Sequence, residues 1–184
     1  MFLKGCLHTH TTCSDGKLTP QQAADTYSEL GYDFIAFTDH DYLLKPEYNE
    51  LYDAVKTNLI IFKGVELTVF EKGYVHVNQI FGDDEELFMF NHLGEYDLTY
   101  EQILERIQAI AQKFPLDCVE ITTKGFPEKQ YDVDEIGYPR VAADDSHTRM
   151  GCGRAWIEMD CRRSKDSIIR AVKAARHWNC YAKG

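Results

Sequence analysis

The chain has 184 residues, 44% of them hydrophobic and 27% charged, and its formal net charge is −10. This length and mixture predict one soluble globular domain over residues 1–184. The acidic balance argues against a nucleic-acid scaffold, which usually carries a basic patch. It leaves room for a small anionic substrate, because bound metal cations reverse the local sign of the potential.

Cysteine usage and the N-terminus indicate the compartment. The six cysteines form no CxxC pair, so we expect reduced thiols. The opening "MFLKGCL" lacks the apolar core and cleavage site of a signal peptide, and no apolar run approaches the length of a membrane span. We therefore expect a cytoplasmic protein without a membrane partner.

Apolar runs alternate with amphipathic stretches along the chain. Thr19 can cap the first helix and Pro20 suits its first turn, while Thr99 and Gln102 have the spacing of a capping box. Residues 124–138 are the most loop-like stretch. In chain order, the expected elements are strand 1–7, helix 19–31, strand 33–39, helix 46–57, strands 59–67, 74–81 and 86–91, helix 99–114, strands 116–122, 138–145 and 154–160, helix 164–177 and strand 179–183.

Strands that alternate with helices predict an α/β fold with βαβ units and a mainly parallel sheet. The chain is short for a full eight-stranded barrel, which takes ~250 residues. We expect a small distorted (β/α) barrel of about seven strands, with its site at the C-terminal strand ends.

Histidines and carboxylates follow these strands closely, and only His76 lies inside its strand. In chain order they are His8, His10 and Asp15 in "HTHTTCSDG", Asp39, His40 and Asp41 in "TDHD", Glu66 in "GVEL", His76 in "YVHVN", His92 in "NH", and Asp144, Asp145 and His147 in "DDSH".

The residue types point to metal binding. Imidazoles and carboxylates without thiolates suit zinc, manganese or iron(II). Side chains alternate along an extended segment, so His8 and His10 point to one side and can hold one ion. The whole set is too large for one tetrahedral ion, which predicts two or three ions with Glu66 or an aspartate bridging.

Some members have ordinary structural interpretations when taken singly. His76 or His92 alone fits a capping or loop residue, and Asp15 in "SDG" alone fits a turn. The repetition of such residues at successive strand ends favours the metal hypothesis.

The motifs "HTHTTCSDG", "TDHD", "GVEL", "NH" and "DDSH", in this order between residues 8 and 147, resemble those of the PHP (polymerase and histidinol phosphatase) family of metal-dependent phosphoesterases. The resemblance implies a distorted barrel with a trinuclear site. It implies that His8, His10 and Asp145 hold one metal ion and that Glu66 bridges to a second. His76 and His92 would complete the second site, and Asp15, His40 and His147 would hold the third. Asp39 would have a supporting role.

Many members of this family carry a large insertion between the third and last motifs. Here 52 residues separate His92 from Asp145, and a helix and a strand use most of them. The chain therefore resembles a minimal PHP domain with an open site, whose substrate selectivity is broad unless an oligomeric partner narrows it.

The resemblance implies hydrolysis of small phosphate monoesters, such as sugar, amino-alcohol or nucleotide phosphates. A hydroxide bridging two or three divalent ions (Mn, Fe or Zn) would attack phosphorus. The expected catalytic residues are Asp15, His40, Glu66, Asp145 and His147. Arg149 is the first candidate for phosphate contact; Lys124, Arg140 and Arg154 are further candidates, although Lys124 and Arg140 also fit solvated surface charges.

Three alternatives stay open at this point. The first is a nuclease or phosphodiesterase acting on nucleotides or short oligonucleotides, although the acidic composition disfavours longer nucleic acid. The second is a non-catalytic metal-binding accessory module. The third is a metal-dependent amidohydrolase, whose barrel also places HxH after its first strand. The oligomeric state is left open.

Overall fold

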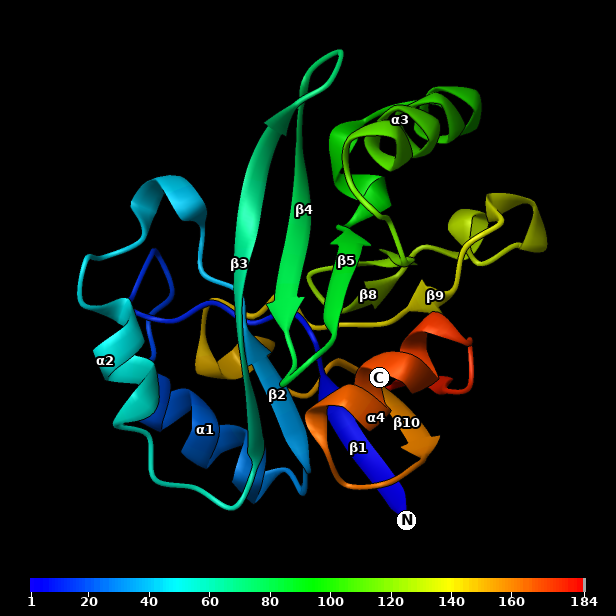
Figure 1. Cartoon of the computed structure of the whole chain (residues 1–184). Helices are drawn as coiled ribbons and strands as arrows, with labels where there is room; N and C mark the ends of the chain where they lie inside the picture. Colours follow the sequence, from blue (N-terminus) through cyan, green and yellow to red (C-terminus); the bar gives the residue numbers. More distant parts are fainter. Residues whose placement is uncertain (184) are drawn as a thin grey trace.

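The computed structural model describes residues 1–183. Its main sheet has nine strands in the order β11-β10-β1-β2-β3-β4-β5-β6-β9 and curves into a nearly closed barrel (Figure 1). The barrel prediction is confirmed, with more strands than the expected seven or so. The strands are β1 (Phe2–Cys6), β2 (Phe34–Phe37), β3 (Ile60–Phe70), β4 (Tyr74–Phe81), β5 (Glu86–Phe90), β6 (Cys118–Glu120), β9 (Arg140–Val141), β10 (Ala155–Asp160) and β11 (Trp178–Tyr181).

Four helices and several 3-10 turns connect the strands. The helices are α1 (Pro20–Glu29), α2 (Tyr48–Asp53), α3 (Tyr100–Lys113) and α4 (Lys165–Lys173). The 3-10 turns are η1 (Asp41–Leu43), η2 (Leu93–Tyr96), η3 (Lys129–Tyr131), η4 (Asp134–Ile136) and η5 (Arg149–Gly151). Strands β7 (Thr122–Thr123) and β8 (Phe126–Pro127) form a separate ribbon.

The sheet is mixed, so the prediction of a mainly parallel sheet is wrong. The pairs β1–β2, β2–β3, β5–β6 and β6–β9 are parallel, whereas β3–β4, β4–β5, β1–β10 and β10–β11 are antiparallel. The connections over residues 71–73 and 82–85 cause the β3–β4 and β4–β5 pairs to be antiparallel. Such short connections make hairpins, since a parallel pair needs a crossover of a dozen or more residues.

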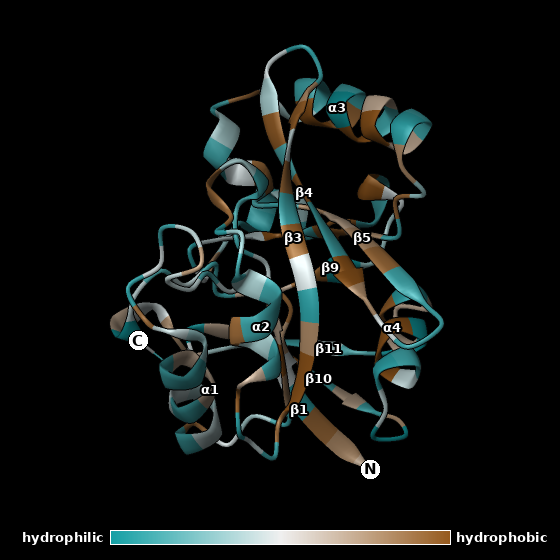
Figure 2. Cartoon of the chain, turned by 60° about the vertical axis from the view of Figure 1, so that its left-hand side comes forward, coloured by the Kyte–Doolittle hydropathy of each residue, from teal (hydrophilic) through white to brown (hydrophobic). Residues whose placement is uncertain are grey.

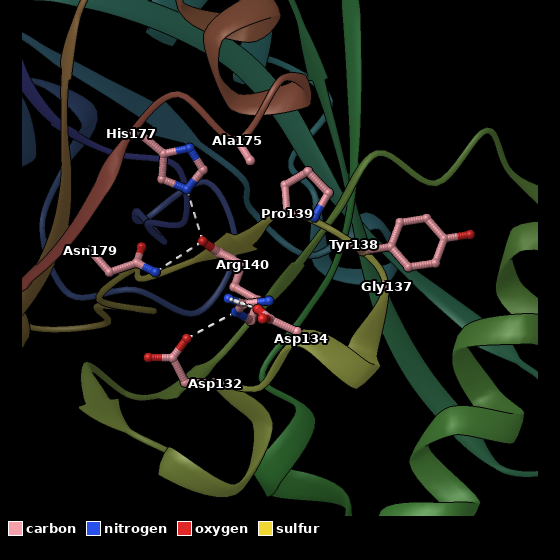
Figure 3. Close-up of a pocket in the computed structure, with 9 residues that line it drawn as sticks. All are labelled: Asp132, Asp134, Gly137, Tyr138, Pro139, Arg140, Ala175, His177 and Asn179. Carbon is pink, nitrogen blue, oxygen red and sulfur yellow. Dashed lines mark hydrogen bonds and ion pairs between the residues drawn. The ribbon is translucent and has the colours of Figure 1, made fainter.

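Side chains tie the two edge strands of the barrel together. Asn179 of β11 donates from Nδ2 to the Arg140 carbonyl of β9 at 3.0 Å, and its Oδ1 accepts from the Ala142 amide at 2.8 Å. His177 contacts the same Arg140 carbonyl at 2.8 Å (Figure 3). At the other end of the barrel, the Thr9–Ser146 bridge joins the segments that follow β1 and β9.

The capping signals predicted two helices well. Thr19 and Thr99 cap α1 and α3, each with a complete capping box to the glutamine three residues on. The predicted second and fourth helices were too long. No side chain caps α2, which spans only Tyr48–Asp53, and α4 ends at Lys173 because Ala175 takes a left-handed conformation (φ 51°).

Two predicted strands are shorter than expected because their residues pair elsewhere. The expected strand 138–145 keeps only Arg140–Val141, since the Ala143 amide bonds to the Thr122 hydroxyl at 3.0 Å instead of to a strand. The expected strand 116–122 is divided into β6 and part of the β7–β8 ribbon. In contrast, β3 runs past its expected end at residue 67 to Phe70.

The interior of the barrel is apolar below the C-terminal strand ends. Leu3, Phe34, Phe62 and Ile80 belong to one buried cluster, which also includes Ile169 of α4. Separate apolar clusters lie under α3 and under α1 with α2. Figure 2 shows hydrophobic residues concentrated on the strands and hydrophilic ones along the outer helices. Within residues 1–183, no helix is both long and apolar enough to cross a bilayer.

Candidate metal centre

The nine predicted metal ligands gather at the C-terminal rim of the barrel. They come from the segments after β1, β2, β5 and β9 and from the strands β3 and β4. Glu66 lies on β3 and His76 on β4, the two strands of the long hairpin (Figure 1). Groups of their ligand atoms lie within 4.8 Å of one another, so they can hold metal ions.

Glu66 lies at the centre of this cluster and is fully buried. Its Oε1 is 3.1 Å from Nε2 of His92 and 3.3 Å from Nδ1 of His76. Its Oε2 is 2.9 Å from Nδ1 of His40 and 3.2 Å from Nε2 of His10. One carboxylate therefore faces histidines on both of its oxygens, the arrangement expected of a bridging ligand.

The HxH pair has the predicted geometry. The Nε2 atoms of His8 and His10 are 3.1 Å apart. Asp145 Oδ1 lies 3.4 Å from the first and 3.2 Å from the second. These three side chains converge on a common point together with Glu66.

A further group lies closer to solvent. Asp15, His40 and His147 form one potential metal-binding group that also includes His10. The Asp15 carboxylate is 3.4 Å from Nε2 of His147 and 3.8 Å from Nε2 of His40. Because His10 and His40 also belong to groups around Glu66, neighbouring ion positions share ligands.

Several buried polar atoms at the centre of the cluster make no hydrogen bond to one another and could instead coordinate a metal cation. The buried atoms Glu66 Oε2, His10 Nδ1 and His40 Nδ1 have no hydrogen-bond partner, although Glu66 Oε2 and His40 Nδ1 are 2.9 Å apart. Close approach without hydrogen-bond geometry is expected when lone pairs point to a common third position. Leaving buried polar atoms unpaired costs about 1–3 kcal/mol each, and a bound cation would satisfy them.

Two further carboxylates, Glu120 and Glu95, contact histidines of the cluster, and the sequence analysis missed both. Glu120 Oε2 accepts from Nδ1 of His8 at 2.8 Å, which directs Nε2 of this histidine toward Glu66. Glu95 lies 3.3 Å from Nδ1 of His92. Carboxylates in this position fix the tautomer and orientation of a ligand histidine. The sequence signal for Glu120 was hidden, because the predicted strand 116–122 runs past the end of β6 at this residue.

Other polar residues support the centre without facing it. Asn91 donates from Nδ2 to Glu66 Oε1 at 2.7 Å and to Asn78 Oδ1 at 2.8 Å. Asp39 accepts from the Thr11 amide at 2.8 Å and from the Ser14 hydroxyl at 2.5 Å. Asp39 thus holds the loop that carries Asp15 rather than touching a histidine.

Asp144 is also turned away from the cluster. It accepts hydrogen bonds from the Gly153 and Ala155 amides, both at 2.7 Å, and from the Tyr27 hydroxyl at 2.9 Å. Burial raises the pKa of Asp144 to about 6 despite these bonds. Its role is to fasten the segment before Asp145 to the body of the barrel.

The charges of the cluster strongly perturb its pKa values. Burial by itself would lower the pKa of His8 and His10. Glu120, Glu66 and Asp145 instead raise the pKa of His8, and Asp145 and Glu66 raise that of His10 to about 9. Burial would raise the pKa of Glu66 and Asp145, but the surrounding histidines hold both well below their usual range. Strong mutual perturbation of this kind is typical of functional sites.

Two ligand positions have an unusual backbone. His92 and Asp145 have φ values of 30° and 45°, in the left-handed region that non-glycine residues seldom adopt. Such strain concentrates at functional sites, where the surrounding structure holds it in place.

The two predicted phosphate-binding residues lie in different surroundings. Lys124 lines the cavity of about 170 Å³ above the ligands, together with Glu95 and His147. It occupies the two-residue turn of the β7–β8 ribbon with Gly125, where both residues have positive φ. Arg149 does not line this cavity and instead pairs with Glu29 at 2.6 Å.

Comparison with known proteins assigns the family. The PHP domain model matches residues 7–106, a stretch that includes seven of the nine predicted ligands, from His8 to His92. The chain belongs to the PHP domain family, as the motifs predicted.

Two relatives are named as nucleic-acid enzymes. The chain is 35% identical over 131 residues to the DNA polymerase/3'-5' exonuclease PolX of Bacillus subtilis, and 33% identical over 111 residues to the 5'-3' exoribonuclease Rnm of Escherichia coli. These matches cover 64% and 58% of this chain, but only 23% and 36% of the relatives. The chain therefore corresponds to a minor part of each.

A solved structure shares the fold over nearly the whole chain. A two-domain Bacteroides vulgatus protein, described as containing a predicted PHP-like metal-dependent phosphoesterase, aligns with a TM-score of 0.72 at 19% identity. The alignment covers 98% of this chain and 65% of that protein.

Proposed function

We propose that this chain is a metal-dependent hydrolase of small phosphate monoesters, such as sugar, amino-alcohol or nucleotide phosphates. The observation that carries the proposal is the buried Glu66 surrounded by histidines beneath a small solvent-accessible cavity. This arrangement offers several cation positions and space above them for one phosphoryl group.

The ligands that would hold the ions are the nine predicted residues, His8, His10, Asp15, His40, Glu66, His76, His92, Asp145 and His147. Two or three divalent ions, Mn, Fe or Zn, would lower the pKa of bound water and neutralise the charge on phosphate oxygens. Glu120 and Glu95 keep His8 and His92 oriented.

Lys124 is placed to assist phosphate binding. Its Nζ is 3.6 Å from Glu95 in the cavity lining, and the turn that carries it is exposed to solvent. A lysine acts on phosphate as a point charge with three donors. Arg149 is the weaker candidate because Glu29 engages its guanidinium.

The charge distribution favours a small substrate. Glu95 and Asp15 line the cavity beside Lys124, and the whole chain carries a net charge of −10. Further phosphates of a long polynucleotide would meet this negative field, since nucleic-acid affinity depends on cations that neutralise the backbone.

Nucleotide release from the end of a nucleic acid is the second candidate. It is supported by the names of the two relatives, both of which are exonucleases. A short single strand could place its terminal phosphodiester at the metal centre without contacting a long basic surface.

The test is an ester panel with metal-loaded protein. Chelated protein would be reloaded separately with Mn, Fe and Zn and offered phosphomonoesters and 5'-labelled short oligonucleotides. Faster hydrolysis of monoesters supports the main proposal, and faster shortening of oligonucleotides supports the second. Bound metal without turnover of any ester would indicate a non-catalytic binding module.

A further inference from the structure

We propose that the groove between Tyr42 and Tyr74 binds the leaving group of the substrate and selects one that is flat, aromatic and uncharged. This inference rests on the proposed phosphoesterase function and adds a substrate preference to it. The groove has a volume of about 510 Å³ and is lined by Asp41, Tyr42, Thr68, Tyr74 and His76. His76 also lines the metal-site cavity, so the two spaces adjoin.

The β3–β4 hairpin places this groove in line with the metal ligands. Side chains alternate between the two faces of a strand, and Thr68 pairs in register with His76. Glu66 and Thr68 therefore share a face of β3, and His76 shares that face with Tyr74 on β4. The same surface leads from the proposed bridging carboxylate to an aromatic wall.

The two faces of the hairpin have different surroundings beyond the metal site. Val75 and Val77 of β4 are buried in the cluster under α3, together with Ile103 and Ile107 of that helix. On the other face Tyr74 is 72% exposed. Its ring meets the Phe70 ring edge-on at 5.3 Å, so the neighbouring strand supports an aromatic surface that the described residues leave uncovered.

The opposite wall is fixed to the same hairpin. Asp41 Oδ1 accepts from the Tyr42 amide at 2.8 Å and from the Thr68 amide at 3.2 Å, which ties η1 to β3. The Tyr42 side chain is 65% exposed, and its ring centroid is 5.3 Å from that of His40. One aromatic ring thus lies beside a proposed metal ligand and faces solvent.

The lining defines the chemistry of the occupant. Exposed tyrosine rings stack on flat aromatic rings, and this stacking depends little on which substituents the bound ring carries. The carboxylate of Asp41 would repel a second phosphate, which favours an uncharged heterocycle over a diester strand.

A matched pair of substrates tests the groove. Adenosine 5'-monophosphate and ribose 5-phosphate share the leaving oxygen and the pentose, but only the former has a base. We expect wild-type protein to have the higher kcat/KM for the nucleotide. Tyr42→Ala and Tyr74→Ala should each lower that value by roughly 5- to 100-fold, the loss expected for one base–aromatic stack. Ribose 5-phosphate should change less than about twofold.

Trp178→Ala is the matched control, since Trp178 is an exposed aromatic residue (57%) on β11. It should leave the ratio of the two kcat/KM values unchanged. Equal losses for both substrates, or no loss for either, in the tyrosine variants would overturn the groove assignment.

Failure of the proposed function would look different. If wild-type protein hydrolysed neither ester with any metal, the phosphatase proposal would fall. Calorimetry on the metal-loaded protein would then decide the groove on binding alone. Tighter binding of the nucleotide that is lost in Tyr42→Ala supports the groove, and equal binding of the two esters refutes it.

Discussion

Charged side chains cluster at two places in the barrel: at the C-terminal rim, which holds the predicted metal ligands, and at the seam, where the edge strands β9 and β11 meet. The two clusters differ in the side chains that oppose their carboxylates. At the seam, Arg140 donates to Asp132 and Asp134 at 2.9 and 3.0 Å and to the Val133 carbonyl at 3.1 Å (Figure 3). Each nitrogen of its guanidinium therefore donates one hydrogen bond. At the rim, the ion pairs of Glu66 are with histidines, and Lys124 lies at the cavity lining, where it pairs with Glu95.

The difference separates a structural cluster from a functional one. At the seam, Arg140 pairs with two carboxylates beside a cavity of about 370 Å³, and burial lowers the pKa of His177 there. At the rim, several buried polar atoms have no hydrogen-bond partner among the described residues, whereas the seam has one, His177 Nδ1. The pKa of His10 at the rim is raised, and a bound cation would satisfy the unpartnered rim atoms.

The largest effect is expected from removing the charge at the centre of the rim. Glu66→Gln keeps the shape and can still accept from Asn91, but it loses the ability to bridge two cations. We expect activity to fall by at least about 1,000-fold, since each metal contributes several kcal/mol. Metal content per chain should fall as well, measured by elemental analysis beside phosphate-ester turnover.

Asp134→Asn at the seam provides the control for that variant. The Asp134 side chain is exposed and pairs only with Arg140, so metal content and turnover should remain as in wild type. Equal losses in both variants would remove the distinction between rim and seam.

A smaller effect is expected behind the metal ligands. Glu120→Gln weakens the contact that orients His8, and such changes typically cost about 10- to 100-fold in metal affinity or activity. Titration with added metal should restore much of the turnover. A variant that excess metal does not rescue would show that Glu120 acts in another way.

The pH dependence of the metal-free protein distinguishes the two regions further. His10 has a folded pKa of about 9 against 6.5 unfolded, so its protonation stabilises the fold fully below pH 6.5. This contribution is lost as the pH rises through 9. The pKa of His177 at the seam is lowered, so its titration changes the stability of the fold only below about pH 6.5. It contributes nothing to the change in stability between pH 6.5 and 9.

Thermal unfolding of chelated protein between pH 6.5 and 9.5 should therefore show a decreasing Tm. Metal affinity should rise over the same range, because a ligand imidazole must be neutral. Calorimetry in buffers of different ionisation enthalpy should detect protons released on metal binding. A metal affinity that is independent of pH would contradict the raised pKa of His10.

The smallest effect is expected at the seam itself. Arg140→Gln removes ion pairs with two exposed carboxylates and one hydrogen bond to a carbonyl. Exposed pairs of this kind contribute about 0.2–1 kcal/mol each. Urea unfolding should show a loss of about 1 kcal/mol, with turnover unchanged; a loss of turnover would link the seam to the site.

The candidate ligands could be proposed from the sequence because most of them stand in a local signature, a short apolar run followed by a histidine or carboxylate. His8, His40 and His92 are clear cases. Glu120 was missed because the predicted strand 116–122 concealed the end of β6 at that residue. Glu95 was missed because its relation to His92 depends on the 3-10 turn η2.

The fold was harder to predict at long range. The alternation of elements indicated a barrel, but not that β10 and β11 extend the sheet beyond β1 or that β9 pairs over only two residues. Those features depend on contacts between distant residues, such as Asn179 with Arg140. The hairpin turn at residues 71–73, with Lys72 and Gly73 at positive φ, could have been inferred from its sequence.

The most direct test of the account is the metal content of protein purified without added metal, measured by elemental analysis before and after chelation alongside phosphate-ester turnover. The account predicts two or three divalent ions per chain, loss of turnover on chelation, and recovery on reloading. A chain that binds no metal, or that hydrolyses esters equally well after chelation, would contradict it.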